Sequence, residues 1–393
     1  MAHALIFGAS GISGWALLNQ LRTYPTPTAF SRITAVTNRP YSLQQAQIPQ
    51  DDRIVIAPGV DLRKTPEQVA EVIRSKVPDA ETVTHVFFAA YIQEDNYETL
   101  SKTNEHLLRA AVCASEQLSS TLKSVVVQTG GKGYGLEFAK ELHVKGPLSE
   151  DMPRIPEPYY SNIFYYNQID LMNELSRGKR WTWTEIRPDG VVGFVPGSNA
   201  MNMAQGFGLY LTLQRAVRGQ GAVVPYPGQK HGYHAKHGDT FQDILAKMEI
   251  HTALHPETCG NGQAFNITDA QRPVTWAEVW PKLCEHFGLV GGEPGDSPQD
   301  LGAFVKRHED VWRAIANKYG LNEELVAQQG WGHTEYMIVD FDFDRQMDLS
   351  KARSVGFKEE IDTAQGYLIA WERMRAAKIL PPREALDTLQ SRI

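Results

Sequence analysis

Residues 5–21 read "LIFGASGISGWALLNQL", and this stretch places Gly8, Gly11 and Gly14 between an apolar run and a helical pattern. Each glycine has a physical reason at its position. Gly8 permits a tight turn, Gly11 lets the backbone approach a pyrophosphate, and Gly14 lets the helix pack closely on the strand. Such a turn after the first strand is typical of a doubly wound fold, so the stretch predicts a dinucleotide site.

The first half of the chain continues this alternation of short apolar runs and helical patterns. Apolar strands that alternate with helices indicate a parallel sheet covered on both faces. We therefore predict an α/β fold: a Rossmann-type doubly wound parallel sheet in residues 1–195, then a smaller, mainly helical substrate-binding lobe in residues 196–393. The predicted strands of the first half lie at 3–7, 33–37, 53–57, 84–88, 124–128 and 181–188.

The second half reads mainly as helices, with few strands. Strands are expected at 264–268 and 336–344, so parts of 220–270 and 336–345 are expected to return to the first domain. The predicted helices of this half lie at 201–218, 239–254, 275–287, 299–317 and 362–377.

Composition narrows the class of partner. The 393 residues carry a net charge of −7 with both signs interspersed, which argues against nucleic acid or an anionic membrane. The three cysteines form no C-x-x-C motif, and we expect reduced thiols. The sequence has no basic leader and no membrane-spanning run, so the expectation is a cytoplasmic protein. His231, His234 and His237 lack further ligands, and no metal is predicted.

The end of the second strand indicates which dinucleotide is bound. An NAD enzyme usually has an acid there to hold the ribose 2′-hydroxyl, but this strand runs into "TNRP" (37–40) without one. Arg39 instead suits a 2′-phosphate, which predicts NADPH/NADP+. The predicted cofactor-binding residues are Gly8, Ser10, Gly11, Ile12, Gly14, Asn38, Arg39, Pro40, Asp61, Leu62, Ala89, Ala90, Tyr91, Thr129, Pro188, Val191 and Met201.

A lysine in a glycine loop, "QTGGKGYG" (128–135), needs a separate explanation. It is no phosphate loop, because Gly133 follows Lys132 where that motif requires Ser or Thr. The Tyr-x-x-x-Lys pair of many reductases is also absent, since its one match, "YPGQK" (226–230), contains Pro and Gly. Lys132 ends a strand and Tyr165 begins the next helix, so the two residues could rebuild the pair from two elements.

At these residues the sequence resembles a known family. "GASGISG", "TNRP", "THVFFAAY", "QTGGKGYG", "FYYNQID" and "TWTEIRPDGVV" resemble the progesterone 5β-reductase/iridoid synthase-like (PRISE) enzymes, an atypical branch of the extended short-chain dehydrogenases. The resemblance covers nearly the whole chain. It implies that Lys132 and Tyr165 are the catalytic pair, and that NADPH reduces an activated C=C bond of a small apolar enone or enal. Hydride then goes to the β-carbon, and the tyrosine hydroxyl holds the enolate oxygen.

Electrostatics agrees with that role. Hydride addition puts negative charge on the carbonyl oxygen, where a phenol is a suitable donor. A nearby ammonium favours that charge and also the phenolate form of Tyr165. The chain departs from the family pattern in "KGYGLEF" (132–138) and in "RPD" (187–189), where the family has Arg-Pro-Gly. These changes border the expected pocket and leave the substrate open.

Two other functions remain as alternatives. One is an NADPH-dependent ketone reductase, or a cofactor-assisted cyclase or isomerase, in secondary metabolism. The other is a non-catalytic NADP-sensing Rossmann protein, which would need neither Lys132 nor Tyr165. The expected partner is a small-molecule carbonyl compound, and the formation of a homodimer is left open.

Overall fold

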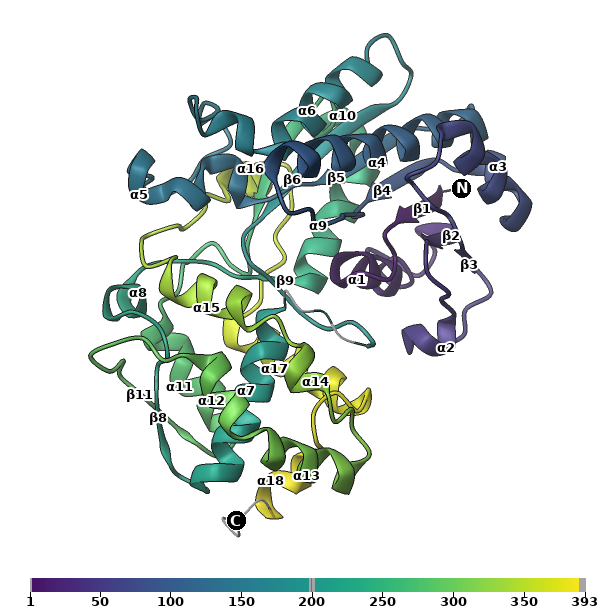
Figure 1. Ribbon diagram of the computed structural model, residues 1–393. Helices are drawn as coiled ribbons and strands as arrows, with labels where there is room; N and C mark the ends of the chain where they lie inside the picture. Colours follow the sequence, from purple (N-terminus) through teal and green to yellow (C-terminus); the bar gives the residue numbers. More distant parts are fainter. Residues whose placement is uncertain (1, 198, 200–201, 389–393) are drawn as a thin grey trace.

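The computed structural model describes residues 2–197, 199 and 202–388, and it contains a seven-stranded sheet whose neighbouring strands all run parallel (Figure 1). The strand order is β10-β6-β5-β4-β1-β2-β3, so the chain reverses direction across the sheet between β1 and β4. The predicted Rossmann-type fold is confirmed. The strands are β1 (Ala2–Phe7), β2 (Phe30–Thr37), β3 (Ile54–Pro58), β4 (His85–Phe88), β5 (Ser124–Gln128), β6 (Thr182–Pro188) and β10 (Gln263–Ile267).

Helices cover both faces of this sheet. The helices α1 and α9 contact each other on one face, and α4 packs between α3 and α6 on the other face. Strand β1 shows why both faces need cover: Ala4 and Ile6 belong to one buried cluster, whereas Leu5 and Phe7 belong to the other. These helices are α1 (Ile12–Gln20), α3 (Pro66–Lys76), α4 (Tyr97–Leu118), α6 (Phe164–Leu175) and α9 (Gln242–Leu254).

Local sequence rules account for where helices begin. The Thr65 side chain accepts a hydrogen bond from the backbone of Gln68, and the Gln68 side chain bonds back to Thr65. This reciprocal cap, with Pro66 at the first helical position, starts α3 where the sequence predicts it.

Strand β10 joins the sheet from far along the chain. Residues 263–267 pair with residues 184–188 of β6, and α9 comes from the same later region to pack on α1, β5 and β6. The seven-stranded sheet is therefore complete only when this later segment is present.

The remaining described elements lie mostly in a second lobe, below the sheet in Figure 1. Helix α7 packs there against α13, α15 and α17, and two short strands, β8 and β11, pair beside α11. The bounds are α7 (Met203–Arg218), α8 (Lys230–His234), α11 (Trp276–His286), α12 (Leu301–Arg307), α13 (Glu309–Tyr319), α14 (Leu325–Gln328), α15 (Trp331–Val339), α17 (Thr363–Ala376), α18 (Arg383–Thr388), β8 (Val223–Pro225) and β11 (Val290–Gly292). Shorter elements elsewhere are α2 (Leu43–Ala46), α5 (Ala139–Leu142), α10 (Pro256–Cys259), α16 (Ser350–Ser354), β7 (Val191–Val192) and β9 (Thr240–Phe241).

Two predicted elements of this lobe are wrong. The strand expected at 336–344 is instead the end of helix α15 followed by a loop. The apolar run "YMIV" suits either structure, and no strand among the described residues pairs with it. The single helix expected at 299–317 is two helices, α12 and α13, which meet at His308. Among the described helices, none combines the length and apolar character needed to cross a membrane.

Candidate functional site

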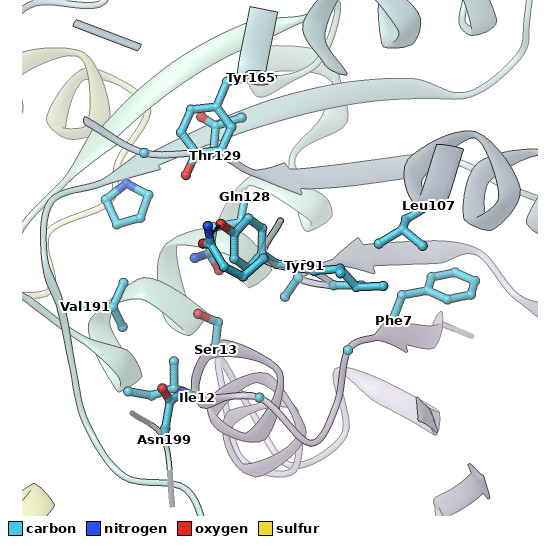
Figure 2. Close-up of a pocket in the computed structure, with 18 of the residues that line it drawn as sticks. Phe7, Ile12, Ser13, Tyr91, Leu107, Gln128, Thr129, Tyr165, Val191 and Asn199 are labelled. Carbon is cyan, nitrogen blue, oxygen red and sulfur yellow. Dashed lines mark hydrogen bonds between the residues drawn. The ribbon is translucent and has the colours of Figure 1, made fainter. Parts of the chain in front are cut away.

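A cavity of about 850 Å³ opens at the carboxyl ends of the sheet strands, beside the neighbouring strands β1 and β4, which are followed by helices on opposite faces of the sheet. Open parallel sheets bind ligands at this kind of place. Figure 2 shows Tyr165 and Thr129 on one side of the cavity and Ile12 and Asn199 across from them. The predicted residues that line it are Gly8, Ser10, Gly11, Ile12, Asn38, Arg39, Asp61, Leu62, Ala89, Ala90, Tyr91, Thr129, Lys132, Tyr165, Pro188 and Val191.

Two of the described residues that were predicted to bind the cofactor, Gly14 and Pro40, do not line this cavity. Gly14 lies behind the turn, where an added Cβ would come 2.2 Å from the Gly8 carbonyl oxygen. This close approach is the helix packing that the sequence predicts for Gly14. Pro40 is exposed beyond the cavity rim. Met201 lies outside the described residues.

The glycine turn fits a dinucleotide. Gly8 has φ +86°, and a Cβ there would meet the Ala89 carbonyl oxygen at 2.7 Å. Gly11 precedes the first turn of α1, which has no side-chain cap, so its backbone N–H groups remain for a ligand. Amides at a helix N-terminus favour an anion such as pyrophosphate.

The ends of β2 and β3 bring two arginines to the cavity. No hydrogen bond or ion pair involves the Arg39 guanidinium group anywhere in the described chain, so this cation is available to a ligand. Arg63 instead holds Asp61 through two hydrogen bonds of 2.9 Å. The hydrogen bonds from Arg63 lower the pKa of Asp61. Asp61 thus faces the cavity as an anion that already has a partner.

The two adjacent tyrosines of α6 have different surroundings. The Tyr166 hydroxyl donates to the Gly133 carbonyl at 2.6 Å and accepts from the Ile155 N–H at 3.1 Å. Tyr165 lines the cavity, and its hydroxyl has no hydrogen bond to any residue that the structure describes. A Cβ at Gly130 would lie 3.3 Å from this hydroxyl. Tyr166 therefore fixes the loop, while Tyr165 presents a free donor.

The predicted lysine is held by an acid. Lys132 lies in the 3₁₀ turn η2 (Gly131–Tyr134), and its ammonium group is 2.7 Å from the Glu137 carboxylate in η3 (Leu136–Phe138). A nearby ammonium favours the phenolate form of Tyr165, but the other surroundings of this side chain favour the neutral phenol. Burial, then Tyr91, Glu137 and Glu185, raises the pKa of Tyr165 above its ordinary value. Tyr165 is a neutral phenol at pH 7.

A buried polar network supports the cavity wall near Tyr165. The Thr129 hydroxyl donates to Glu185 at 2.6 Å, and Arg187 donates to the other Glu185 oxygen at 2.8 Å. Arg187 also donates to the Tyr134 hydroxyl at 3.1 Å, and Tyr134 donates to Asn266 at 2.6 Å. The network links β5, η2, β6 and β10, so the strand ends that carry the site are held together.

Several cavity residues were not predicted from the sequence. His333, Tyr336 and Met337 come from α15, which the sequence reading assigned partly to a strand, and Phe341 follows that helix. Glu137 was noted only as a departure from a pattern. Its ion pair with Lys132 had no sign in the sequence, because a separation of five residues is not a spacing at which side chains regularly meet.

Asp189, which stands where the family pattern has glycine, also has a structural role. Arg345 donates to Asp189 at 3.1 Å, and its side chain is 1% exposed. Arg345 also lies over the Phe341 ring, with 5.4 Å from the guanidinium carbon to the ring centre. Asp189 thus ties the end of β6 to the segment that carries Phe341 into the cavity.

Comparisons with known proteins agree with this geometry. The model of the PRISE-like Rossmann-fold domain matches residues 4–381. The chain is 36% identical to the short chain dehydrogenase sirQ of Leptosphaeria maculans, covering 97% of this chain and 98% of that protein. It is 26% identical to (S)-8-oxocitronellyl enol synthase of Catharanthus roseus, covering 96% and 92%. Among solved structures, UDP-glucuronic acid 4-epimerase of Bacillus cereus, in complex with NAD, shares the fold, with a TM-score of 0.61, 13% identity and coverage of 95% and 99%.

Proposed function

The chain belongs to the PRISE-like Rossmann-fold family of short-chain dehydrogenases, and from this premise we propose that it uses NADPH to reduce an activated C=C bond. The substrate in this proposal is a small apolar enone or enal. The observation that carries the proposal is the free hydroxyl of Tyr165 in the cavity, next to a tyrosine whose hydroxyl is fully used.

Tyr165 would act as a hydrogen-bond donor to the substrate oxygen. Burial raises its pKa, so the phenol carries its proton at neutral pH. Hydride arriving at the β-carbon leaves negative charge on the carbonyl oxygen, and a fixed donor there stabilises that charge. In this proposal Lys132, which lines the same cavity, would supply positive charge to the site, moderated by its ion pair with Glu137.

The cofactor in this proposal is NADPH, which supplies the hydride when bound. The α1 N-terminus would hold its pyrophosphate, and Pro188 and Val191 would pack on its nicotinamide. The unpaired Arg39 guanidinium suits a 2′-phosphate, and the end of β2 carries no acid that would repel one.

Two further observations support conjugate reduction. The cavity wall away from the glycine turn is largely apolar, with Phe164, Tyr336, Met337 and Phe341, which suits a hydrophobic carbonyl compound. The name of the Catharanthus roseus relative denotes the synthesis of an enol. An enol or enolate is the first product when hydride adds to the β-carbon of an enal.

The test is turnover of NADPH against a panel of enones and enals, with NADH in parallel and the products identified by mass and NMR. NADPH deuterated at the transferring position should place deuterium on the β-carbon of a saturated carbonyl product. An allylic alcohol with deuterium on the carbonyl carbon would instead establish a ketone reductase. Tight NADPH binding without turnover of any panel member would reject the proposal and favour the cyclase or the sensor.

A further inference from the structure

Arg345 lies in the segment that follows α15, and its charged group is buried between two carboxylates. Its Nε donates to Asp189 at 3.1 Å, and its Nη2 lies 3.8 Å from Asp239, which is beyond hydrogen-bond distance. The side chains of Arg345, Asp189 and Asp239 are 1%, 3% and 0% exposed. A buried ion pair is costly to assemble, and the best-attested reason to keep one is that it fixes a particular arrangement of the chain.

Arg345 also holds the segment that carries Phe341. Its guanidinium carbon lies 5.4 Å from the centre of the Phe341 ring, and the same group donates to the Phe341 carbonyl at 3.5 Å. The Arg345 backbone N–H donates to the Lys236 carbonyl at 2.9 Å, and the Lys236 N–H donates to the Asp344 carboxylate at 2.7 Å. Residues 341–345 are therefore held through both side-chain and backbone contacts.

This chain of contacts reaches the cavity wall at both ends. Asp189 and Phe341 each line the cavity, and the Phe341 ring packs on Tyr336 with 4.9 Å between the ring centres. Met337 packs against the same strand end, since a Cβ at Gly190 would lie 3.0 Å from its Cε methyl group. The position of the Phe341 ring thus depends on the end of β6 through Arg345.

The volume of the cavity makes the position of this ring important. A pocket for one drug-sized ligand usually has about 300–1,000 Å³. In the proposed function, the cavity of about 850 Å³ must hold both NADPH and the substrate. The depth to which one phenyl ring enters the wall therefore bears strongly on which substrates fit.

We propose that Asp189 and Arg345 are positioning residues that hold the Phe341 ring in the cavity wall and thereby restrict the substrate to compact enones or enals, with an open chain or a single ring. With glycine at position 189, as in the family pattern, the Arg345 Nε would lose the carboxylate that it now bonds. The selection of substrates rests on the proposed function, whereas the hold on residues 341–345 concerns the protein alone.

The first test is hydrogen exchange of the ligand-free protein, followed by mass spectrometry. In Asp189→Ala, the amides of residues 341–346 should exchange at least roughly tenfold faster, because a hydrogen bond between charged groups is lost. Asp239 stays 3.8 Å from the guanidinium group, so this variant keeps a carboxylate near Arg345. Asp189→Asn keeps a neutral acceptor and should give a smaller increase, and it carries the test if the alanine variant does not fold.

A second arginine offers a matched control. Arg373 binds Asp243 at 2.6 Å and lies over the Phe241 ring at 5.5 Å, but none of these three residues lines the cavity. Asp243→Ala should therefore leave hydrogen exchange at residues 341–346 unchanged. Exchange in Asp189→Ala that matches the wild type at these residues, or that rises equally throughout the chain, overturns the inference, as does an equal rise in Asp243→Ala.

Substrate selection is tested with 2-cyclohexen-1-one and with the steroid androst-4-ene-3,17-dione. The ratio of kcat/KM for the steroid to kcat/KM for cyclohexenone should rise at least roughly tenfold in Asp189→Ala and in Phe341→Ala, since differences in fit to an apolar pocket are worth about this much. Combining the two changes should give no further rise, because both act on one side chain. A merely structural defect would lower both kcat/KM values and leave their ratio unchanged.

The possible failures can be told apart. An unchanged ratio, or effects that multiply in the double variant, overturns the role of the two residues in substrate selection. Absence of any enone turnover by the wild type would reject the proposed function, while hydrogen exchange would still decide whether Asp189 and Arg345 hold residues 341–345.

Discussion

Replacing each of the two adjacent tyrosines of α6 by phenylalanine should give opposite results. Tyr165→Phe removes a hydroxyl that has no protein partner among the described residues, so folding stability should hardly change. Loss of one oxyanion donor usually lowers kcat by a factor of roughly 100 to 1,000. We expect a loss of that size for Tyr165→Phe with the best enone of the panel.

Tyr166→Phe is the matched control. It removes the hydroxyl of the next residue in the helix. This hydroxyl donates to the Gly133 carbonyl at 2.6 Å and accepts from the Ile155 N–H at 3.1 Å. Leaving a buried N–H and a partly buried carbonyl without partners should cost about 1–3 kcal/mol of unfolding free energy. The effect on kcat should be smaller than for Tyr165→Phe, because the Tyr166 hydroxyl does not reach the cavity.

The assay combines kcat at saturating NADPH with urea unfolding of each variant. The reasoning fails if Tyr165→Phe keeps more than about a tenth of wild-type kcat, which is far above the expected loss. It also fails if Tyr165→Phe destabilises the protein more than Tyr166→Phe, since the hydrogen bonds would then have been assigned to the wrong side chain.

Three further predictions follow from other parts of the structure. Arg39→Ala should weaken NADPH binding roughly 10- to 100-fold and leave NADH binding unchanged in calorimetry, whereas an equal loss for both would disprove a 2′-phosphate contact. Gly14→Ala should destabilise the fold by at least about 1–3 kcal/mol in urea unfolding, because its Cβ would lie 2.2 Å from the Gly8 carbonyl oxygen. Gly133→Ala, which meets nothing within 4 Å, is its control and should be tolerated. Burial raises the pKa of Glu249 to about 8 from 4.5, so the folded state keeps a proton that the unfolded chain releases. Unfolding free energy should therefore fall by up to about 1.4 kcal/mol per unit as pH rises between these values, and Glu249→Gln should flatten this slope; an unchanged slope would contradict the assignment.

The parallel sheet and the glycine turn at its carboxyl edge could be predicted from the sequence because the residues that determine them are close together in the chain. The spacing of Gly8, Gly11 and Gly14 encodes a turn within seven residues, and Thr65 with Pro66 encodes a helix start within two. The position of Tyr165 early in its helix, after Lys132 at a strand end, was likewise sufficient to bring both into one cavity.

The cavity wall opposite the sheet could not be predicted from local sequence patterns in the same way. Whether residues 336–339 form a strand or a helix depends on which elements lie beside them, and the sequence alone does not give those neighbours. The Glu137 ion pair depends on two successive 3₁₀ turns, whose geometry no short pattern specifies. The role of Asp189 depends on Arg345, which is 156 residues away.

The late arrival of β10 has a consequence for how this protein is made. Strand β6 ends at Pro188, but its partner strand is complete only at Ile267. At roughly 5–20 residues per second, a ribosome needs about 4–16 s to synthesise the intervening chain. During that interval a parallel strand with an unpaired edge is exposed, which is the surface that chaperones shield and that nascent chains use to aggregate. Yield in a foreign host should therefore depend more on translation speed and chaperone supply over residues 189–267 than on the stability of the finished fold.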